Sequence, residues 1–336
     1  MNDYRTTLRM TLLAFLLIFS VNCQKENIQL ESDFNISENK TAVLKSAHVS
    51  GYLSTLIENI GSLVEKEMLG KGVGNSLESK VSNAINNLVR GNNNSAKGQL
   101  SAFINEVKSL IENSIIPADL GLQLITMAEN SILLIDGSFT DLRDGQKYAV
   151  VLIGNQLWMA ENLKATQYND GSPIPQLTAN QSWITTTDGA YCWYDNDEAT
   201  YKQTYGALYN WYAVDTGILS PKGWHIPSNT EWLTLIDYLG GENIAGSKLK
   251  EAGTSHWLSP NTGATNESKF TALPAGDRIG ADGTFYNIYG YAIFWSSDGP
   301  TETLGINRVL VFDDTNFRIG YDNKFAGFSV RCVKDY

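Results

Sequence analysis

The sequence predicts an α+β protein with two folded parts, a small helical bundle over residues 41–136 and a mixed α+β domain over residues 139–336. Three observations favour this division. The length of 336 residues exceeds what one hydrophobic core usually holds. Apolar residues recur with helical spacing in the first part, whereas short strand-like runs and turns follow Phe139. All eight Trp and fourteen of the sixteen Tyr lie at or after Tyr148.

The first 22 residues have the order of a secretory signal peptide. Arg5 and Arg9 precede an apolar run from Met10 to Phe19, and small or polar residues then lead to Cys23. A helix of ten residues spans only about 15 Å, roughly half of the hydrocarbon core, so we expect this segment to be removed. It resembles a lipoprotein signal, which implies that Cys23 becomes the acylated first residue. Ordinary cleavage with an incidental Cys23 is the alternative.

Residues 23–40 are polar and show no period, which is typical of a flexible tether. An acylated chain is expected to be exported and held in the cell envelope through its lipid, at the outer membrane and facing the surface. The net charge is −11, and no run rich in Lys and Arg interrupts the acidic balance. Nucleic acid is therefore not an expected partner, because its binding depends on clustered cations.

Three apolar stripes with i, i+3 and i+4 spacing predict three helices in the first part. They consist of Leu53, Leu56, Ile57, Ile60, Leu63 and Val64; of Leu77, Val81, Ala84, Ile85 and Leu88; and of Leu100, Phe103, Ile104, Val107, Leu110 and Ile111. A fourth helix is expected to begin at Pro117, because proline suits a first helical turn. The segments Gly70–Gly74 and Gly91–Asn94 are short and rich in helix breakers, which favours antiparallel neighbours.

Residues 74–107 resemble a helical accessory module found beside secreted bacterial hydrolases and adhesins. The resemblance implies a spacer or an interaction module. Plain core packing is the alternative for each apolar residue of the stripes, because any helical bundle needs such stripes.

In the second part, Arg143–Gln146 fits a hairpin turn before the strand-like run Tyr148–Ile153. Ser228–Glu231 is a capping box that should open a helix, and Gly240 with Gly241 should end it. Later strands are expected over residues 306–312, 317–319 and 327–333. The fold class is therefore mixed α+β.

Four phrases of this part resemble the Fibrobacter succinogenes major paralogous domain over residues 141–335. They are Gln156–Leu163, Tyr205–Val214, Gly223–Ser228 with Glu231 and Trp232, and Gly327–Val333. The resemblance implies a bacterial envelope or secreted protein and supplies no reaction. Trp224–Trp232 and Gly327–Phe328 are also similar to the formylglycine-generating sulfatase modifiers, which implies a C-type-lectin-like fold by analogy.

No catalytic residue, cofactor or metal site is expected in this part. Its two histidines, His225 and His256, lack metal-ligand spacing, and the position of His225 before the capping box favours a role in ordering the turn. The redox cysteine pair of the sulfatase modifiers has no counterpart. Asp195–Glu198 gathers oxygen ligands of the kind that calcium prefers, but without an EF-hand pattern a solvated loop is the favoured interpretation.

Five aromatic residues are candidates for stacking on a ligand, with core packing as the alternative. They are Trp193, Tyr194, Trp211, Trp257 and Tyr291. Cys192 and Cys332 form an even pair in an exported domain, which predicts a disulfide, with two buried thiols as the alternative.

Abundant aromatics without an assembled catalytic set favour a surface-displayed binding domain whose ligand is a glycan or a protein. An enzyme related to the sulfatase modifiers and a purely structural envelope protein are the alternatives.

Overall fold

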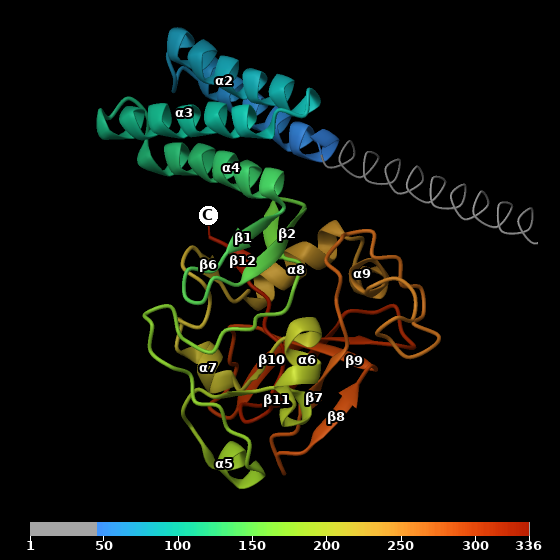
Figure 1. Cartoon of the computed structure of the whole chain (residues 1–336). Coiled ribbons are helices and arrows are strands. Elements are labelled where there is room, and N and C mark those ends of the chain that lie inside the picture. The colour runs from blue at the N-terminus through green and yellow to red at the C-terminus, as the bar shows by residue number, and fades with distance from the viewer. Residues whose placement is uncertain (1–45, 336) are drawn as a thin grey trace, which may run out of the picture. The chain divides into compact units, whose positions relative to one another are not determined.

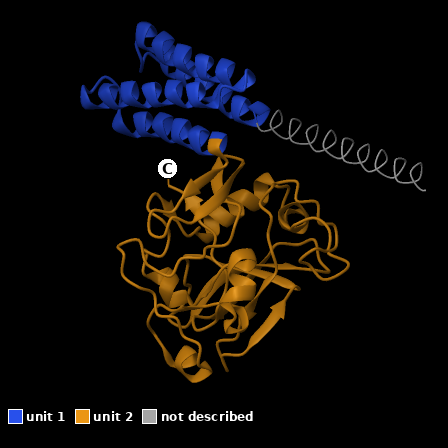
Figure 2. Ribbon diagram, in the orientation of Figure 1, with its two compact units in different colours: residues 1–135 blue, residues 136–336 orange. Residues whose placement is uncertain are grey.

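The computed structural model describes residues 46–335, which divide into two compact units (Figures 1 and 2). The first unit ends at Ile135 and the second begins at Asp136. The predicted signal peptide, the tether and Cys23 lie outside the described residues.

The first unit is helical. Residues 46–65 form one helix, and α2 (Lys71–Val89), α3 (Asn93–Glu112) and α4 (Ala118–Asp136) follow (Figure 1). The predicted stripes lie inside the unit, since their members Leu53, Leu56 and Ile60, then Leu77, Val81 and Ala84, then Leu100, Phe103 and Val107 are buried. The helical prediction for this part is therefore confirmed.

Helix α4 is apolar along most of its length. By length and composition alone it is the one helix among residues 46–335 that would cross a membrane. However, 44% of its apolar window is buried within the structure. Buried Leu124, Ile125 and Ala128 make this burial typical of a bundle's core helix.

The second unit contains a five-stranded antiparallel sheet in the order β1-β2-β3-β12-β6. Its strands are β1 (Ser138–Thr140), β2 (Lys147–Ile153), β3 (Gln156–Met159), β12 (Val333–Lys334) and β6 (Trp224–His225). The predicted hairpin turn joins β1 to β2 and places Phe139 opposite Tyr148. The last strand in the sequence therefore lies in the interior of the sheet, between β3 and β6.

Three smaller sheets complete the unit. They pair β9 (Tyr291–Trp295) and β11 (Arg318–Asn323) with the two edges of β10 (Leu304–Val311), β4 (Tyr191–Cys192) with β5 (Leu208–Tyr209), and β7 (Ala275–Arg278) with β8 (Phe285–Ile288). Strands β10 and β11 confirm two of the predicted late strands.

The third predicted strand, over residues 327–333, is wrong as a single element. Gly327, Phe328 and Ser329 each form an isolated bridge to a different segment, at Arg278, Tyr209 and Phe294 respectively. Only Val333 at the end of this stretch belongs to a strand. The apolar pattern arises because the chain crosses several buried segments in turn, rather than one partner strand.

Short helices connect the sheets. They are α5 (Asn180–Thr185), the 3-10 helix η1 (Tyr194–Asn196), α6 (Glu198–Tyr205), α7 (Trp211–Asp215), α8 (Asn229–Tyr238) and α9 (Glu242–Leu249). The predicted capping box opens α8, with the Ser228 hydroxyl accepting from the backbone of Glu231 and the Glu231 side chain accepting from the backbone of Ser228. The predicted mixed α+β class is confirmed.

Two hydrophobic clusters hold the second unit together. The larger cluster centres on Trp158, Trp232 and Phe270, whose rings lie within about 6 Å of one another. The smaller one surrounds Trp183 and includes Cys192. The smaller cluster supports the segments that carry the candidate site.

Candidate functional site

The aromatic residues singled out from the sequence are mostly core. Trp193, Trp211 and Trp257 are only 0%, 3% and 2% exposed, and the indole N–H groups of Trp211 and Trp257 donate to backbone carbonyls. Their predicted stacking on a ligand is therefore wrong. These tryptophans are buried by segments from distant parts of the chain, and the amino-acid composition does not reveal such packing. Tyr291 is half-buried at the start of β9.

The fifth of these residues, Tyr194, belongs to a group of tyrosines that the structure brings together. We call Tyr194, Tyr201, Tyr205 and Tyr289 the tyrosine surface. Ring centroids lie 5.1 Å apart for Tyr194 and Tyr201, 6.0 Å for Tyr201 and Tyr205, and 6.1 Å for Tyr205 and Tyr289. Tyr194 and Tyr205 are buried and support Tyr201, which is half-buried, and Tyr289, which is 40% exposed.

Three separate segments supply these rings. Tyr194 lies in η1, Tyr201 and Tyr205 lie four residues apart on one face of α6, and Tyr289 follows β8. Asp197 caps α6 by accepting from the backbone of Thr200 at 3.1 Å. The i, i+4 spacing of Tyr201 and Tyr205 behind a capping residue is the one signal in the sequence that pointed to this face.

The backbone on both sides of the tyrosine surface adopts left-handed conformations without glycine. Asp195 and Asn196 have φ values of 52° and 56°, and Asn287 and Tyr289 have values of 63° and 66°. Each such residue costs on the order of 1 kcal/mol, and strained backbone of this kind is concentrated at functional sites. The surrounding packing must therefore hold η1 and the turn after β8 in place.

That packing is visible around Tyr194. Its ring lies 5.4 Å from Phe285 of β8 and passes over Gly276 of β7. A Cβ at Gly276 would lie 2.7 Å from Cε2 of Tyr194 and 2.5 Å from the carbonyl oxygen of Tyr286. Glycine at this position lets the ring approach the hairpin.

A buried arginine supports the same hairpin from below. The Arg278 guanidinium is stacked 4.5 Å from Trp183 and 4.8 Å from Phe285. It donates to the carbonyl oxygens of Leu177 and Thr178 at 2.6 and 3.0 Å. Because these groups lie on three segments, the arginine fixes the hairpin relative to the chain before α5.

Two phenols of the tyrosine surface, those of Tyr201 and Tyr205, stay neutral. Burial, with added contributions from neighbouring tyrosines, raises the pKa of both Tyr201 and Tyr205 to about 12. His256 packs edge-on against Tyr205 at 5.9 Å, and its Nδ1 lies 2.9 Å from Glu251. The surface therefore offers apolar ring faces together with uncharged hydroxyl groups.

The acidic segment Asp195–Glu198 has structural uses beside this surface. Asp197 caps α6, as described above, and Glu198 forms an ion pair of 2.7 Å with Lys202. Across residues 46–335, no group of three or more His, Cys, Asp or Glu is arranged to hold a metal ion.

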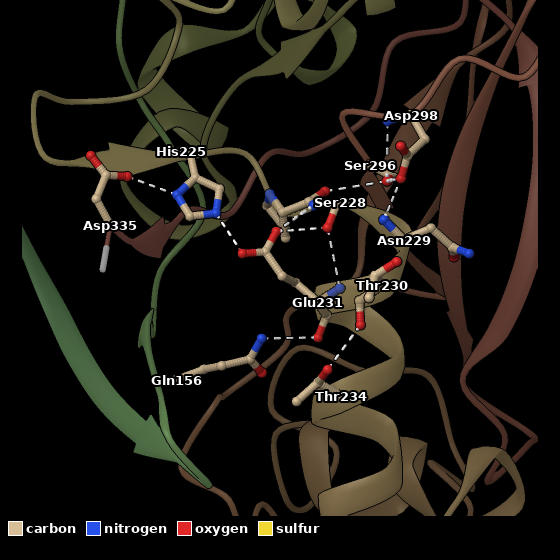
Figure 3. A network of polar contacts seen from close by, with 11 residues as sticks. Gln156, His225, Ser228, Asn229, Thr230, Glu231, Thr234, Ser296, Asp298 and Asp335 are labelled. Atoms are coloured by element: carbon tan, nitrogen blue, oxygen red, sulfur yellow. Dashed lines mark hydrogen bonds and ion pairs between the residues drawn. The ribbon is translucent and has the colours of Figure 1, made fainter. Parts of the chain in front are cut away.

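His225 lies in a separate polar network, shown in Figure 3. Its Nδ1 is 2.7 Å from Asp335, and its Nε2 is 2.7 Å from Glu231, the capping residue of α8. Burial opposes protonation, but hydrogen bonds to Glu231 and Asp335 outweigh it and raise the pKa of His225. Because both ring nitrogens are engaged, the structure supports the interpretation that His225 orders this turn.

The predicted disulfide is not formed, since Cys192 and Cys332 are both buried free thiols. Cys192 packs in the smaller cluster near Arg278, whereas Cys332 lies next to β12 and near Arg143. The two thiols belong to different packing environments, so an even cysteine count did not indicate proximity.

Comparison with known proteins gives one match. The model of the Fibrobacter succinogenes major domain family matches residues 151–334, a range that contains the whole tyrosine surface and His225. No curated protein and no solved structure matches the chain.

Proposed function

The chain belongs to the Fibrobacter succinogenes major domain family, and we propose that its second unit is a binding module that holds a neutral glycan on the tyrosine surface. The observation that carries this proposal is the row of four tyrosine rings, in which Tyr201 is half-buried, Tyr289 is exposed and the other two rings lie buried behind them. Tyrosine suits this task because its ring has an apolar face and a polar tip.

Three further features support a neutral sugar as the ligand. The hydroxyl groups of Tyr201 and Tyr205 remain protonated at neutral pH, so they donate as well as accept hydrogen bonds. Leu258 is 47% exposed and adds an apolar contact beside Tyr289. The two residues are held together because the backbone N–H of Leu258 donates to the carbonyl oxygen of Tyr289. The chain's net charge of −11 disfavours polyanionic ligands.

The module belongs, in this proposal, to a cell-envelope lipoprotein at the outer membrane surface. The signal-like segment before Cys23 supports lipid attachment, and the first unit is a helical spacer between the lipid and the binding module. The similarity to the sulfatase modifiers supports a C-type-lectin-like fold for the module. Several acyl chains hold a protein on a membrane, whereas one chain alone is marginal.

The binding proposal is tested with the full chain made soluble by a Cys23→Ser substitution. A panel of neutral oligosaccharides is screened, and hits are titrated by calorimetry. Saturable binding is expected, and Tyr289→Ala or Tyr201→Ala should weaken it by about tenfold, since ring stacking contributes about 1 kcal/mol beyond area burial.

Tyr286→Ala is the matched control. Tyr286 is 52% exposed and lies on the same hairpin, but it neighbours Phe285 in β8 and so points to the opposite face. An equal loss in this variant, or no binding to any oligosaccharide, would contradict the proposal. Conversion of the bound sugar would support the alternative of an enzyme.

Lipid attachment is tested separately in cells that express the chain. Radiolabelled fatty acid should enter the wild type and not the Cys23→Ser variant. Equal labelling of the two proteins, or a wild type found entirely in the soluble fraction, would show that the anchor is absent.

A further inference from the structure

The second unit also contains a cleft, which shares no residue with the tyrosine surface. This cleft has a volume of about 470 Å³. It is bounded by Phe139–Arg143 at the β1–β2 hairpin, by the loop around Gln167–Gly171, and by Pro221 with Lys222. Its size lies within the usual range for small-molecule sites, about 300 to 1,000 Å³.

The wall of the cleft is held by one ion pair. Arg143 donates to both carboxylate oxygens of Asp141, with distances between 2.6 and 3.0 Å. Its Nη1 donates to the carbonyl oxygens of Gln167 and Leu219 at 2.8 and 2.7 Å. This arginine therefore ties together the three segments that bound the cleft, and it uses the charge of Asp141.

Other polar side chains around the cleft are not used by the fold. Within residues 46–335, the side chains of Thr140, Gln167, Asn169 and Lys222 make no hydrogen bond or ion pair. Together they offer a hydroxyl, two amides and an ammonium group. The Asp170 carboxylate also lines the cleft, and its Oδ1 accepts from the backbone and the hydroxyl of Ser172. The ammonium and the two amides supply most of the donors of this set.

Two cations, Lys222 and Lys334, lie beside the cleft. Among residues 46–335, no carboxylate forms an ion pair with Lys222, although the Asp170 carboxylate attracts it over a longer distance. Nζ of Lys334 lies over the adjacent Gly223, 3.4 Å from where a Cβ would stand. Asp335, the nearest acidic neighbour of Lys334 in sequence, is held by His225. An acceptor with negative charge therefore finds a favourable place at the Lys222 end.

Apolar side chains also border the cleft. Leu142 is 94% exposed, and the Phe139 ring is half-buried and stacked 4.4 Å from Trp224. An exposed leucine beside a cavity is a contact surface for the carbon face of a ligand. The cleft thus combines apolar side chains, neutral donors and a cation.

From this arrangement we propose that the cleft binds a compact sugar or polyol that carries one carboxylate. The carboxylate lies at Lys222, the hydroxyl groups meet Thr140, Gln167 and Asn169, and the carbon skeleton packs on Leu142. The family match begins at residue 151, so the Phe139–Arg143 wall lies outside it. The site therefore depends partly on a segment outside the matched range.

The test uses the full chain with the Cys23→Ser substitution and two probes, a hexuronic acid and the matching neutral hexose, titrated by calorimetry. The hexuronic acid should bind saturably and about tenfold more tightly than the hexose, because one charge-assisted contact contributes about that factor. Its affinity should fall as salt is raised, since Lys222 is exposed.

Variants decide whether the binding occurs in this cleft. Lys222→Gln should weaken the hexuronic acid severalfold and abolish the preference over the hexose, while Asn169→Ala should weaken both probes. Lys202→Gln, which removes a cation of α6 that does not line the cleft, should leave the affinity for the hexuronic acid unchanged. Equal binding of the two probes, unchanged affinity in Lys222→Gln, or no saturable binding would overturn the proposal, whatever the tyrosine surface binds.

Discussion

His225 Nδ1 lies 2.7 Å from the Asp335 carboxylate, which joins the last described residue of the chain to β6. Glu231 occupies the other ring nitrogen at the same distance. Since neither carboxylate donates, both contacts are hydrogen bonds only when the imidazole carries two protons. The ring is therefore a cationic link between β6, α8 and the end of the chain.

This link predicts a loss of stability as the pH rises. The pKa of His225 is raised above its ordinary value of 6.5, so the folded state binds the proton more tightly than the unfolded chain. The contribution is fully present below the ordinary value and is lost as pH rises through the raised pKa. Because the ring is partly exposed, we expect about 1 to 2 kcal/mol, measured by urea unfolding across pH.

A His225→Asn variant should be less stable than the wild type at pH 6 and should lack this loss of stability with rising pH. His256→Asn is the control, because His256 contacts one carboxylate only. The prediction is wrong if wild type and His225→Asn show the same dependence on pH.

At Asp277, in contrast to His225, we expect a substitution to stabilise the folded protein at neutral pH. Burial raises the pKa of this carboxyl from 3.8 to about 6, against the hydrogen bond from Asn287 and with added repulsion from Asp322. The folded state therefore binds the proton more tightly, and stability falls as pH rises from about 4 to about 6. Asp277→Asn keeps an acceptor for Asn287 and should raise the free energy of unfolding at pH 7 by roughly 1 to 3 kcal/mol.

The measurement is urea unfolding of wild type and Asp277→Asn between pH 4 and pH 7. The gain should grow through this window and then level off. A variant that is less stable at pH 7, or a gain that is constant from pH 4, would show that ionisation of Asp277 does not limit stability.

Gly276→Ala should loosen the hairpin that presents Tyr289. Its φ of 66° disfavours a side chain, and the added Cβ would also press on Tyr194 and on the backbone of Tyr286 and Ile288. We expect a destabilisation of about 2 to 4 kcal/mol, seen as a lower melting temperature.

Gly145→Ala is the control that separates the cost of a positive φ from the cost of crowding by the added Cβ. Gly145 has a φ of 74° but open space where a Cβ would stand, so only the backbone term of about 1 kcal/mol applies. Equal losses in the two variants would mean that crowding at Tyr194 contributes nothing.

The two buried cysteines should be unreactive in the folded protein. Burial raises the pKa of the Cys192 thiol to about 12, and it raises the pKa of Cys332 as well. Thiolates are the reactive form, so a thiol reagent at pH 8 should modify neither residue until denaturant is added. With Cys23 replaced by Ser, mass spectrometry should then count two modified thiols, and a count of zero without reductant would reveal a disulfide.

Local signals in the sequence were reliable where one segment decides its own structure. The capping box of Ser228 and Glu231, the helical stripes and the turn at Arg143–Gln146 all depend on residues within one or two turns of each other. The candidate site, in contrast, depends on residues that are far apart in the sequence. Tyr289 meets Tyr205, 84 positions away, and His225 meets Asp335, 110 positions away.

Local sequence patterns also failed to predict which aromatic side chains are buried. Trp257 is buried, whereas Tyr201 is half-buried and Tyr289 is exposed, although all three have polar neighbours in the sequence. Whether a ring is covered depends on segments that pack over it from elsewhere in the chain. The five residues proposed from composition accordingly contained only one member of the tyrosine surface.

The interior place of β12 in the main sheet also fixes when the domain is able to fold. Residues 333 and 334 bridge β3 to β6, so neither strand has its partner on that side before the end of the chain arrives. In the export that we propose for this chain, the N-terminus leaves the channel first, and β12 leaves it after every other strand. The helical unit could then form first, while the second unit lacks the strand that completes its main sheet until β12 has emerged.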